Sequence, residues 1–237
     1  MKIRIRDYEV PVRGKSVRLA IKSHLFKKWI ESLDPLFIVV GIEIQSVDTV
    51  KRKGEEKVLF LKLKAEITDK TGRIYPGIFF LRGDSVAILV ILETPEKKYV
   101  VVIESHLPSI GKRNSLQLPA GMMDTETDAL QVALREMEEE TGLNPALGQM
   151  IHLGHIYPSP GACDEAIHLF LFEAKMSEAE VMLLQGTTTG LAEEGEHLVV
   201  KLVELDELCP KTQDPKAHSA HMLYCALKMK GNYHEND

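Results

Sequence analysis

The stretch LPAGMMDTETDALQVALREMEEETGL, residues 118–143, organises the interpretation of the whole chain. Thr125, followed three residues later by Asp128, predicts a helix that starts with a capping box. Gly142 predicts the end of this helix, because glycine readily adopts the left-handed conformation of a helix C-terminus. Between these limits, apolar residues recur at helical spacing and predict one buried face, made of Leu130, Ala133, Leu134 and Met137.

Three glutamates gather on a neighbouring face of the same helix. At about 100° per residue, Glu136, Glu139 and Glu140 fall within about 100° of one another. Such carboxylates repel one another, and a Mg²⁺ ion would compensate them, because it takes oxygen ligands. The alternative is a solvated acidic face, which the glutamates alone would favour. The preceding compact loop at residues 118–121 favours the metal site over the solvated face, because the loop can bring backbone groups close to the helix start.

The spacing of this stretch resembles the Nudix box of the Nudix hydrolases. That box is a glycine, five residues, a glutamate, seven residues, and then R-E-U-x-E-E-x-G-U, where U is aliphatic. Here Gly121 is followed by thirteen residues and then by REMEEETGL at residues 135–143. One position departs from the pattern: Thr127 stands in place of the first glutamate, with Glu126 and Asp128 on either side. The departure concerns the local salt bridges of Arg135 more than the metal site.

The resemblance implies an α/β fold, the Nudix α/β/α sandwich with a mixed sheet, and a divalent metal site. The metal would be Mg²⁺, or Mn²⁺ in its place, bound by Glu136, Glu139, Glu140 and the carbonyl of Ala120. Arg135 would orient the glutamates through charge-assisted hydrogen bonds. Arg135 and Glu139 therefore count among the expected catalytic residues.

A second motif is YPSPGACDE at residues 157–165. Two prolines and a glycine predict a rigid turn with exposed backbone amides, and taken alone it would be only a tight loop. After the box, it resembles the loop of Nudix ADP-ribose and nucleotide-sugar diphosphatases. That resemblance implies substrate contacts from Tyr157, Ser159, Gly161, Asp164 and Glu165.

A third motif is EEGEHLVV at residues 193–200, an acidic loop that enters a strand. Such a loop is usually solvated surface, but in this branch of the family it resembles the position of the catalytic base or of an extra metal ligand. Glu194 and Glu196 are the matching candidates.

Two further positions depart from the nucleotide-sugar branch. Gln117 replaces the glutamate of Glu-Leu-Pro-Ala-Gly, and Glu104-x-His106 replaces a Gln-x-Arg that helps to bind the diphosphate. Histidine is a weaker cation at pH 7, so Arg113 or Arg82 would supply the missing charge. The expected substrate-binding residues therefore include Arg82, His106 and Arg113.

The composition is that of a soluble globular protein, with 44% hydrophobic and 27% charged residues among 237. A net charge of −6 disfavours nucleic acid and anionic membranes as partners. The apolar runs at residues 36–42 and 86–92 are too short to span a bilayer. Three widely spaced cysteines without a CxxC pair argue against zinc and suit a reducing compartment. With no pattern of a signal or transit peptide at the N-terminus, the cytoplasm is expected.

Two domains are expected, with the boundary in the turn that contains Gly72 and Pro76. Residues 1–75 form a small, mostly-β domain with one amphipathic helix at residues 16–33, and residues 76–237 form the Nudix hydrolase domain. Trp29 of that helix is expected in the core or in an interface. By resemblance, the N-terminal domain forms a homodimer.

The expected activity is Mg²⁺-dependent hydrolysis of a nucleoside diphosphate-sugar, of the ADP-ribose, ADP-glucose or UDP-glucose type. The products would be a nucleoside monophosphate and a sugar phosphate. Two alternatives stay open. One is a Nudix hydrolase of another substrate class, and the other is a Nudix-fold ligand-binding or regulatory module without turnover.

Overall fold

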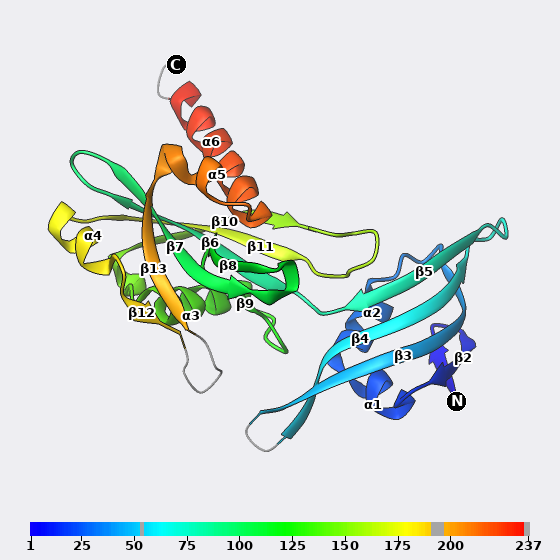
Figure 1. The fold of residues 1–237 in the computed structure, drawn as a ribbon. Helices are drawn as coiled ribbons and strands as arrows, with labels where there is room; N and C mark the ends of the chain where they lie inside the picture. Colours follow the sequence, from blue (N-terminus) through cyan, green and yellow to red (C-terminus); the bar gives the residue numbers. More distant parts are fainter. Residues whose placement is uncertain (53–54, 191–196, 235–237) are drawn as a thin grey trace. The chain divides into compact units, whose positions relative to one another are not determined.

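The structure is a computed structural model that describes residues 1–52, 55–190 and 197–234 (Figure 1). The chain divides into two compact units. The first unit consists of Met1–Asp84 with Tyr157–Ala166, and the second of Ser85–Ile156 with Ile167–Asp237. The expected boundary between residues 75 and 76 falls inside a strand of the first unit, Ile74–Leu81. This strand pairs with its neighbour along its whole length.

The first unit contains a five-stranded sheet in the order β1-β2-β3-β4-β5. Its strands are β1 (Lys2–Ile5), β2 (Tyr8–Gly14), β3 (Ile38–Arg52), β4 (Glu55–Thr68) and β5 (Ile74–Leu81). Neighbouring strands are antiparallel except for β2 and β3, which are parallel. Side chains of β4 alternate between the two faces of the sheet, and those on the inward face are buried: Leu61, Leu63, Ala65 and Ile67.

Two helices, α1 (Val17–Lys22) and α2 (His24–Ser32), replace the single helix expected at residues 16–33. Ser23 between them has an extended backbone, and its hydroxyl caps α2 by accepting a hydrogen bond from the Phe26 N–H at 3.2 Å. Trp29 is buried as expected, and its ring lies 5.9 Å from those of Phe26 and Phe79.

The turn between β4 and β5 is organised by Asp69. Its carboxylate accepts hydrogen bonds from the hydroxyls of Thr71 and Tyr75, at 2.5 and 2.8 Å, and from the backbone N–H groups of Thr71 and Arg73. These bonds, the one from the Thr71 side chain first, stabilise the ionised form and lower the pKa of Asp69 to about 2.

The second unit is built on a mixed eight-stranded sheet in the order β10-β11-β6-β7-β13-β12, with β8 paired to β7 and β9 to β6. Only the β11–β6 pair among these is parallel. The strands are β6 (Ser85–Glu93), β7 (Lys98–Leu107), β8 (Lys112–Gln117), β9 (Ala120–Met122), β10 (Gly148–Ile156), β11 (Ile167–Lys175), β12 (Thr188–Thr189) and β13 (Leu198–Glu204). Part of the loop expected at residues 118–121 therefore belongs to a short strand, because β9 pairs with β6.

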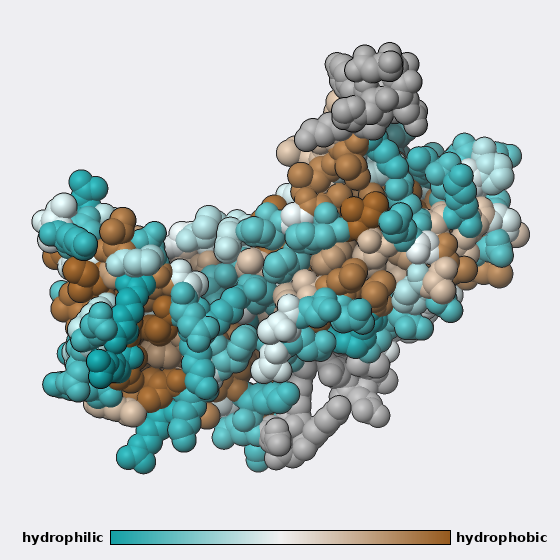
Figure 2. Space-filling view, turned by 180° about the vertical axis from the view of Figure 1, so that it is seen from behind, coloured by the Kyte–Doolittle hydropathy of each residue, from teal (hydrophilic) through white to brown (hydrophobic). Residues whose placement is uncertain are grey.

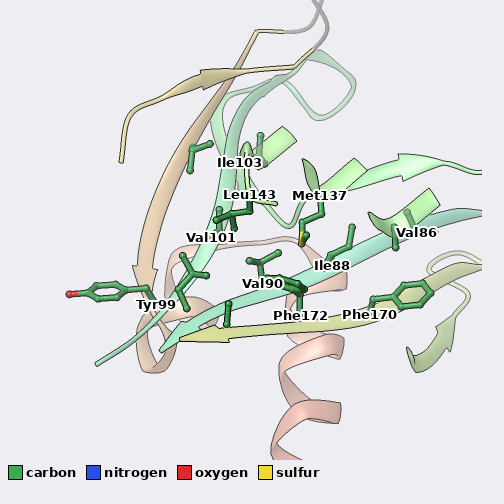
Figure 3. Close-up of a cluster of buried hydrophobic side chains, with 14 of the residues drawn as sticks. Val86, Ile88, Val90, Tyr99, Val101, Ile103, Met137, Leu143, Phe170 and Phe172 are labelled. Carbon is green, nitrogen blue, oxygen red and sulfur yellow. The ribbon is translucent and has the colours of Figure 1, made fainter. Parts of the chain in front are cut away.

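Helices cover both faces of this sheet. On one face, Val86, Ile88 and Val90 of β6 pack with Met137 of α3 (Ala129–Thr141), as Figure 3 shows. On the other face, the intervening residues of β6 pack with α6 (Pro215–His234), and this cluster includes Ala87, Leu89, Ile91, Ala217, Ala220 and Tyr224. This arrangement is the expected α/β/α sandwich with a mixed sheet.

The remaining elements of the second unit are short. They are α4 (Glu178–Leu184), α5 (Leu208–Lys211), and the 3₁₀ turns Pro108–Ile110, Pro145–Leu147 and Leu205–Glu207. Ser177 starts α4 with a complete capping box to Glu180. Helix α6 also carries the exposed apolar residues Met222, Leu227 and Met229, and Figure 2 shows apolar residues gathered over this helix.

The helix of the box begins later than predicted. Asp128 is the N-cap, because its carboxylate accepts hydrogen bonds from the N–H groups of Leu130 and Gln131, so the capping box expected at Thr125 is wrong. Gly142 ends the helix with φ 73°, as predicted. The buried face is also rotated from the one expected. Leu130 is 40% exposed and Val132 is buried instead, because the helix turns Glu140 toward the sheet.

Candidate active site

The carboxylate of Glu136 lies directly against the backbone of Gly121 in β9. A Cβ atom on residue 121 would lie 2.0 Å from Cδ and 2.2 Å from Oε1 of Glu136. Only glycine leaves room for the carboxylate at this place, which gives a steric reason for the glycine of the box.

Glu140 lies against the preceding residue of β9. The N–H of Ala120 donates a hydrogen bond to Oε2 of Glu140 at 2.9 Å, and Glu140 is only 9% exposed. A strand residue directs its N–H and C=O toward the same edge. The C=O of Ala120 therefore points to the edge of β9 where the Glu140 carboxylate lies, which is the direction that its predicted metal contact requires.

Arg135 supplies positive charge between the carboxylates. Its guanidinium lies 2.9 Å from Oε1 of Glu136, 3.0 Å from Oε2 of Glu139 and 3.5 Å from Oε1 of Glu126. Burial lowers the pKa of Arg135, but Glu136, Glu139 and Glu126 together raise it above its ordinary value. Glu126 thus contacts Arg135 next to Thr127, the position where the box pattern has its own glutamate. The contacts of Arg135 are those its predicted orienting role requires, and the role itself stays a prediction.

The oxygen-rich composition of this cluster fits a hard divalent cation. Carboxylate oxygens and a backbone carbonyl are the ligands that Mg²⁺ takes. Arg135 pairs with three carboxylates, those of Glu126, Glu136 and Glu139, and the carboxylate of Glu140 lies against Ala120. Within residues 1–52, 55–190 and 197–234, however, no three His, Cys, Asp or Glu side chains converge as metal ligands. The reason is visible in the contacts: Glu136 and Glu139 turn to Arg135, and Glu140 turns to the Ala120 N–H. The predicted metal ligands therefore stay predictions.

The end of α3 is joined to the segment that leads into the third motif. The hydroxyl of Thr189 donates a hydrogen bond to the carbonyl of Glu140 at 2.6 Å, and the N–H of Gly190 donates to that of Glu139 at 3.4 Å. Glu194 and Glu196, the candidates for the catalytic base, lie outside the described residues.

The YPSPG loop belongs to the first unit and is attached there to the end of β5. The N–H of Phe80 donates to the carbonyl of Ala162 at 2.7 Å, and Phe80 forms a parallel bridge with Cys163. Tyr157, Ser159 and Gly161, expected to contact substrate, are all exposed.

Two acidic residues of this loop have partners within the chain. Asp164 accepts hydrogen bonds from the N–H groups of Arg82 and Gly83, at 2.7 and 3.3 Å. Glu165 forms an ion pair with the guanidinium of Arg82 at 3.3 Å. Arg82, Asp164 and Glu165, each expected to bind substrate, are therefore brought together by the structure, and they fasten the loop to the end of β5.

The other two candidate cations lie on the hairpin of β7 and β8 in the second unit. His106 and Arg113 are both exposed, and the ring of His106 accepts a hydrogen bond from the Asn114 N–H at 3.5 Å. Gln117 is partly buried in β8. The structure does not join His106 and Arg113 to Glu136, Glu139 or Glu140 by any described contact.

Sequence reasoning missed two contacts of the cluster. Glu126 was named only as a neighbour of Thr127, although three residues of separation between Glu126 and the helix start place it within reach of Arg135. No local signal indicated Thr189, because its contact with Glu140 joins residues 49 apart in the chain.

Comparisons with known proteins show which family the chain resembles. The NUDIX domain matches residues 82–224. Nudix hydrolase 14, chloroplastic, of Arabidopsis thaliana is 37% identical over 93% of this chain and 76% of its own length. The ADP-ribose pyrophosphatase of Bacillus subtilis is 34% identical over 37% of this chain and 45% of its own length.

A solved structure shares the fold. A chain described as an ADP compounds hydrolase superimposes with a TM-score of 0.51 at 17% identity, over 80% of this chain and 94% of that one. In the described part of the present chain, no helix is long and apolar enough to cross a membrane. The domain match covers the box, the strands around it and α3, and the Arabidopsis relative extends the similarity over nearly the full length. The chain therefore belongs to the Nudix family of hydrolases.

Proposed function

We propose that the protein hydrolyses the diphosphate of a nucleoside diphosphate-sugar, of the ADP-ribose, ADP-glucose or UDP-glucose type. The products are a nucleoside monophosphate and a sugar phosphate. The observation that carries this proposal is the placement of the Glu136 and Glu140 carboxylates against the backbone of Gly121 and Ala120. Support for the substrate class comes from relatives named ADP-ribose pyrophosphatase, in Bacillus subtilis and in Haemophilus influenzae.

The chemical difficulty is the attack of water on a phosphorus atom surrounded by negative oxygens. A bound Mg²⁺ or Mn²⁺ would neutralise the diphosphate and lower the pKa of a bound water. In this proposal Glu136, Glu139, Glu140 and the Ala120 carbonyl hold the cation. Arg135 keeps Glu136 and Glu139 in place through the ion pairs at 2.9 and 3.0 Å.

The remaining roles are assigned by resemblance. Glu194 or Glu196 positions the attacking water or takes its proton. Tyr157 contacts the nucleotide from the YPSPG loop, with Ser159 and Gly161 beside it, and His106 or Arg113 faces the phosphates. Asp164, Glu165 and Arg82 act on the substrate through the shape of that loop, because their described contacts lie within it.

Phosphate release from a panel of nucleotides tests the reaction. ADP-ribose, ADP-glucose and UDP-glucose are each incubated with the enzyme and Mg²⁺ or Mn²⁺, and a phosphatase then frees phosphate from the monoester products. We expect release from at least one of these substrates, and none after chelation of the metal. A dinucleoside polyphosphate and coenzyme A complete the panel, with a control that lacks the enzyme because the phosphatase itself frees the 3′-phosphate of coenzyme A. Release above that control only from one of these two would assign the chain to another Nudix class. Binding without release from any nucleotide would favour a module without turnover.

The protein is further proposed to form a homodimer through its first unit. The face of this sheet opposite α1 and α2 exposes apolar residues of β5, where Ile78 is 53% exposed and Phe80 38% exposed. The ring of Phe80 lies 5.1 Å from that of Phe60 in the neighbouring strand β4. Light scattering at micromolar concentration is expected to give twice the mass of one chain, and a monomer would contradict the proposal. A cytoplasmic location also stays a proposal, because the Arabidopsis relative is named as chloroplastic.

A further inference from the structure

The two residues that connect β8 to β9 hold the backbone of the candidate active site in place. Leu118 and Pro119 lie directly before Ala120 and Gly121, and both are buried. A buried N–H needs a hydrogen-bond partner, because leaving it unpaired costs about 1–3 kcal/mol. The partner of the Leu118 N–H is found 96 residues further along the chain.

That partner is Asp214, which immediately precedes α6. Its Oδ2 accepts the Leu118 N–H at 3.0 Å, while its Oδ1 accepts the Lys216 N–H at 3.0 Å and contacts the Lys216 ammonium at 2.9 Å. The Asp214 side chain is 1% exposed. One buried carboxylate therefore caps the start of α6 and holds the strand connection at the same time.

Thr212 makes a second attachment two residues earlier. Its hydroxyl donates to the carbonyl of Leu116 at 2.6 Å and accepts the N–H of Asp214 at 3.0 Å. The carbonyl of Thr212 is in turn 2.9 Å from Nε2 of His218 in α6. Thr212 and Asp214, here called the clamp, thus engage the last part of β8 and the residue that follows it.

The opposite side of the same short segment is held by the box helix and by β6. The N–H of Ala120 donates to Glu140 at 2.9 Å, and the carbonyl of Pro119 accepts the N–H of Ile88 at 2.9 Å. The backbone of residues 118–120 is therefore hydrogen-bonded to more than one neighbouring element. The clamp holds it from the α6 face of the sheet, and Glu140 holds it from the α3 face.

We propose that Thr212 and Asp214 are positioning residues for the active site. They set the place of the Ala120 and Gly121 backbone against the carboxylates of Glu136 and Glu140. A helix cap alone would not need a buried charge, because serine or asparagine at the surface caps as well and burying a carboxylate is costly. The hydrogen bond that the Asp214 carboxylate accepts from the Leu118 N–H is not needed to cap α6. The expected effect of the clamp on turnover rests on the proposed function.

Two substitutions test the clamp, and the one at Thr212 has a matched conservative variant. Asp214→Asn removes the charge at constant size, and Thr212→Val removes the hydroxyl at nearly constant shape, while Thr212→Ser keeps the hydroxyl. We expect the first two to lower kcat by about tenfold to a hundredfold, because displacements near 1 Å have effects of this size. The concentration of Mg²⁺ for half-maximal activity should rise, the KM for the nucleotide should change less than kcat, and Thr212→Ser should restore activity.

Ser177→Ala is the control for a purely structural effect. Ser177 caps α4 in the same unit and has no described contact with residues 116–121. We expect this variant to lower the melting temperature while leaving kcat within about twofold of the wild type. If Ser177→Ala lowered kcat as much as Asp214→Asn at an equal loss of stability, the positioning role would be refuted.

Amide hydrogen exchange in the full chain, without substrate or metal, gives a readout that does not depend on turnover. Exchange at Leu118 and Ala120 should accelerate at least about tenfold in Asp214→Asn and Thr212→Val, and stay at the wild-type rate in Ser177→Ala. Unchanged exchange together with unchanged kcat would overturn the inference. A wild-type protein that hydrolyses none of the nucleotides would instead refute the proposed function, while accelerated exchange would still support the clamp.

Discussion

Replacing Gly121 by alanine should separate catalysis from stability in this protein. The new Cβ would lie 2.0 Å from Cδ of Glu136, which must retreat by about 1.4 Å to reach an ordinary contact distance of 3.4 Å. The backbone of Gly121 is not in the left-handed region, so alanine itself is tolerated there. The carboxylate moves because it is the far end of a flexible side chain, and the strand stays in place.

The expected change in stability is small. Moving Glu136 weakens its ion pair with Arg135, which is partly exposed and contributes about 1 kcal/mol or less. Alanine in place of glycine in a strand recovers about 0.5–1 kcal/mol, mostly from the unfolded state. The free energy of unfolding should therefore change by less than about 1 kcal/mol. Turnover should fall by about a hundredfold, or about 2.7 kcal/mol of transition-state stabilisation, because Glu136, the proposed metal ligand, would have moved by more than 1 Å.

The assay measures both quantities on one preparation. Thermal unfolding gives the stability, and phosphate release at varied Mg²⁺ gives kcat and the metal dependence. Gly41→Ala in β3 of the first unit is the matched control, since its new Cβ would meet only a Pro11 carbon, at 3.9 Å. If Gly121→Ala kept wild-type kcat and the wild-type Mg²⁺ dependence, Glu136 would not belong to the site and the reasoning would fail.

Three other outcomes can be measured independently. Glu139→Gln combined with Glu140→Gln removes two charges at constant size and should lower kcat by at least about 100-fold; near-normal turnover in the double variant would exclude these glutamates as metal ligands. Asp69→Ala should lower the melting temperature at pH 7, and the difference from wild type should shrink as the pH falls from about 4 to about 2. The reason is that the depressed pKa stabilises the folded state only while Asp69 is ionised, and a pH-independent difference would argue against it. Ile78→Lys places a charge on the exposed face of the first unit and should give a monomer in light scattering with an unchanged fold by circular dichroism, whereas a persistent dimer would place the interface elsewhere.

Local patterns were sufficient to predict most elements of the fold. The N-terminal part of the chain was expected to be mostly β-structure, and it forms a five-stranded sheet. Gly142 was identified as the helix end from its residue type alone. Strands β8, β9 and β12 were missed, because each is short and becomes a strand only by pairing with a neighbour.

The helix start shows where local signals compete. Thr125 and Asp128 both match the residue types that cap helices, and a capping box favoured the first. The chain uses Asp128, whose carboxylate bonds two N–H groups. The face that is buried was also misjudged, since counting apolar residues alone could not show that Glu140 would turn inward to bond the Ala120 N–H.

The sequence by itself determined that Glu136, Glu139 and Glu140 share one side of a helix with Arg135, because the helical repeat fixes the direction of side chains that lie within two turns of one another. Only the tertiary structure decided what this side meets: the bare backbone of Gly121, the N–H of Ala120 and, through the start of α6, a buried aspartate bonded to Leu118. Contacts of this second kind join segments separated by up to 96 residues. They depend on how sheets and helices pack, and no spacing within the chain encodes them.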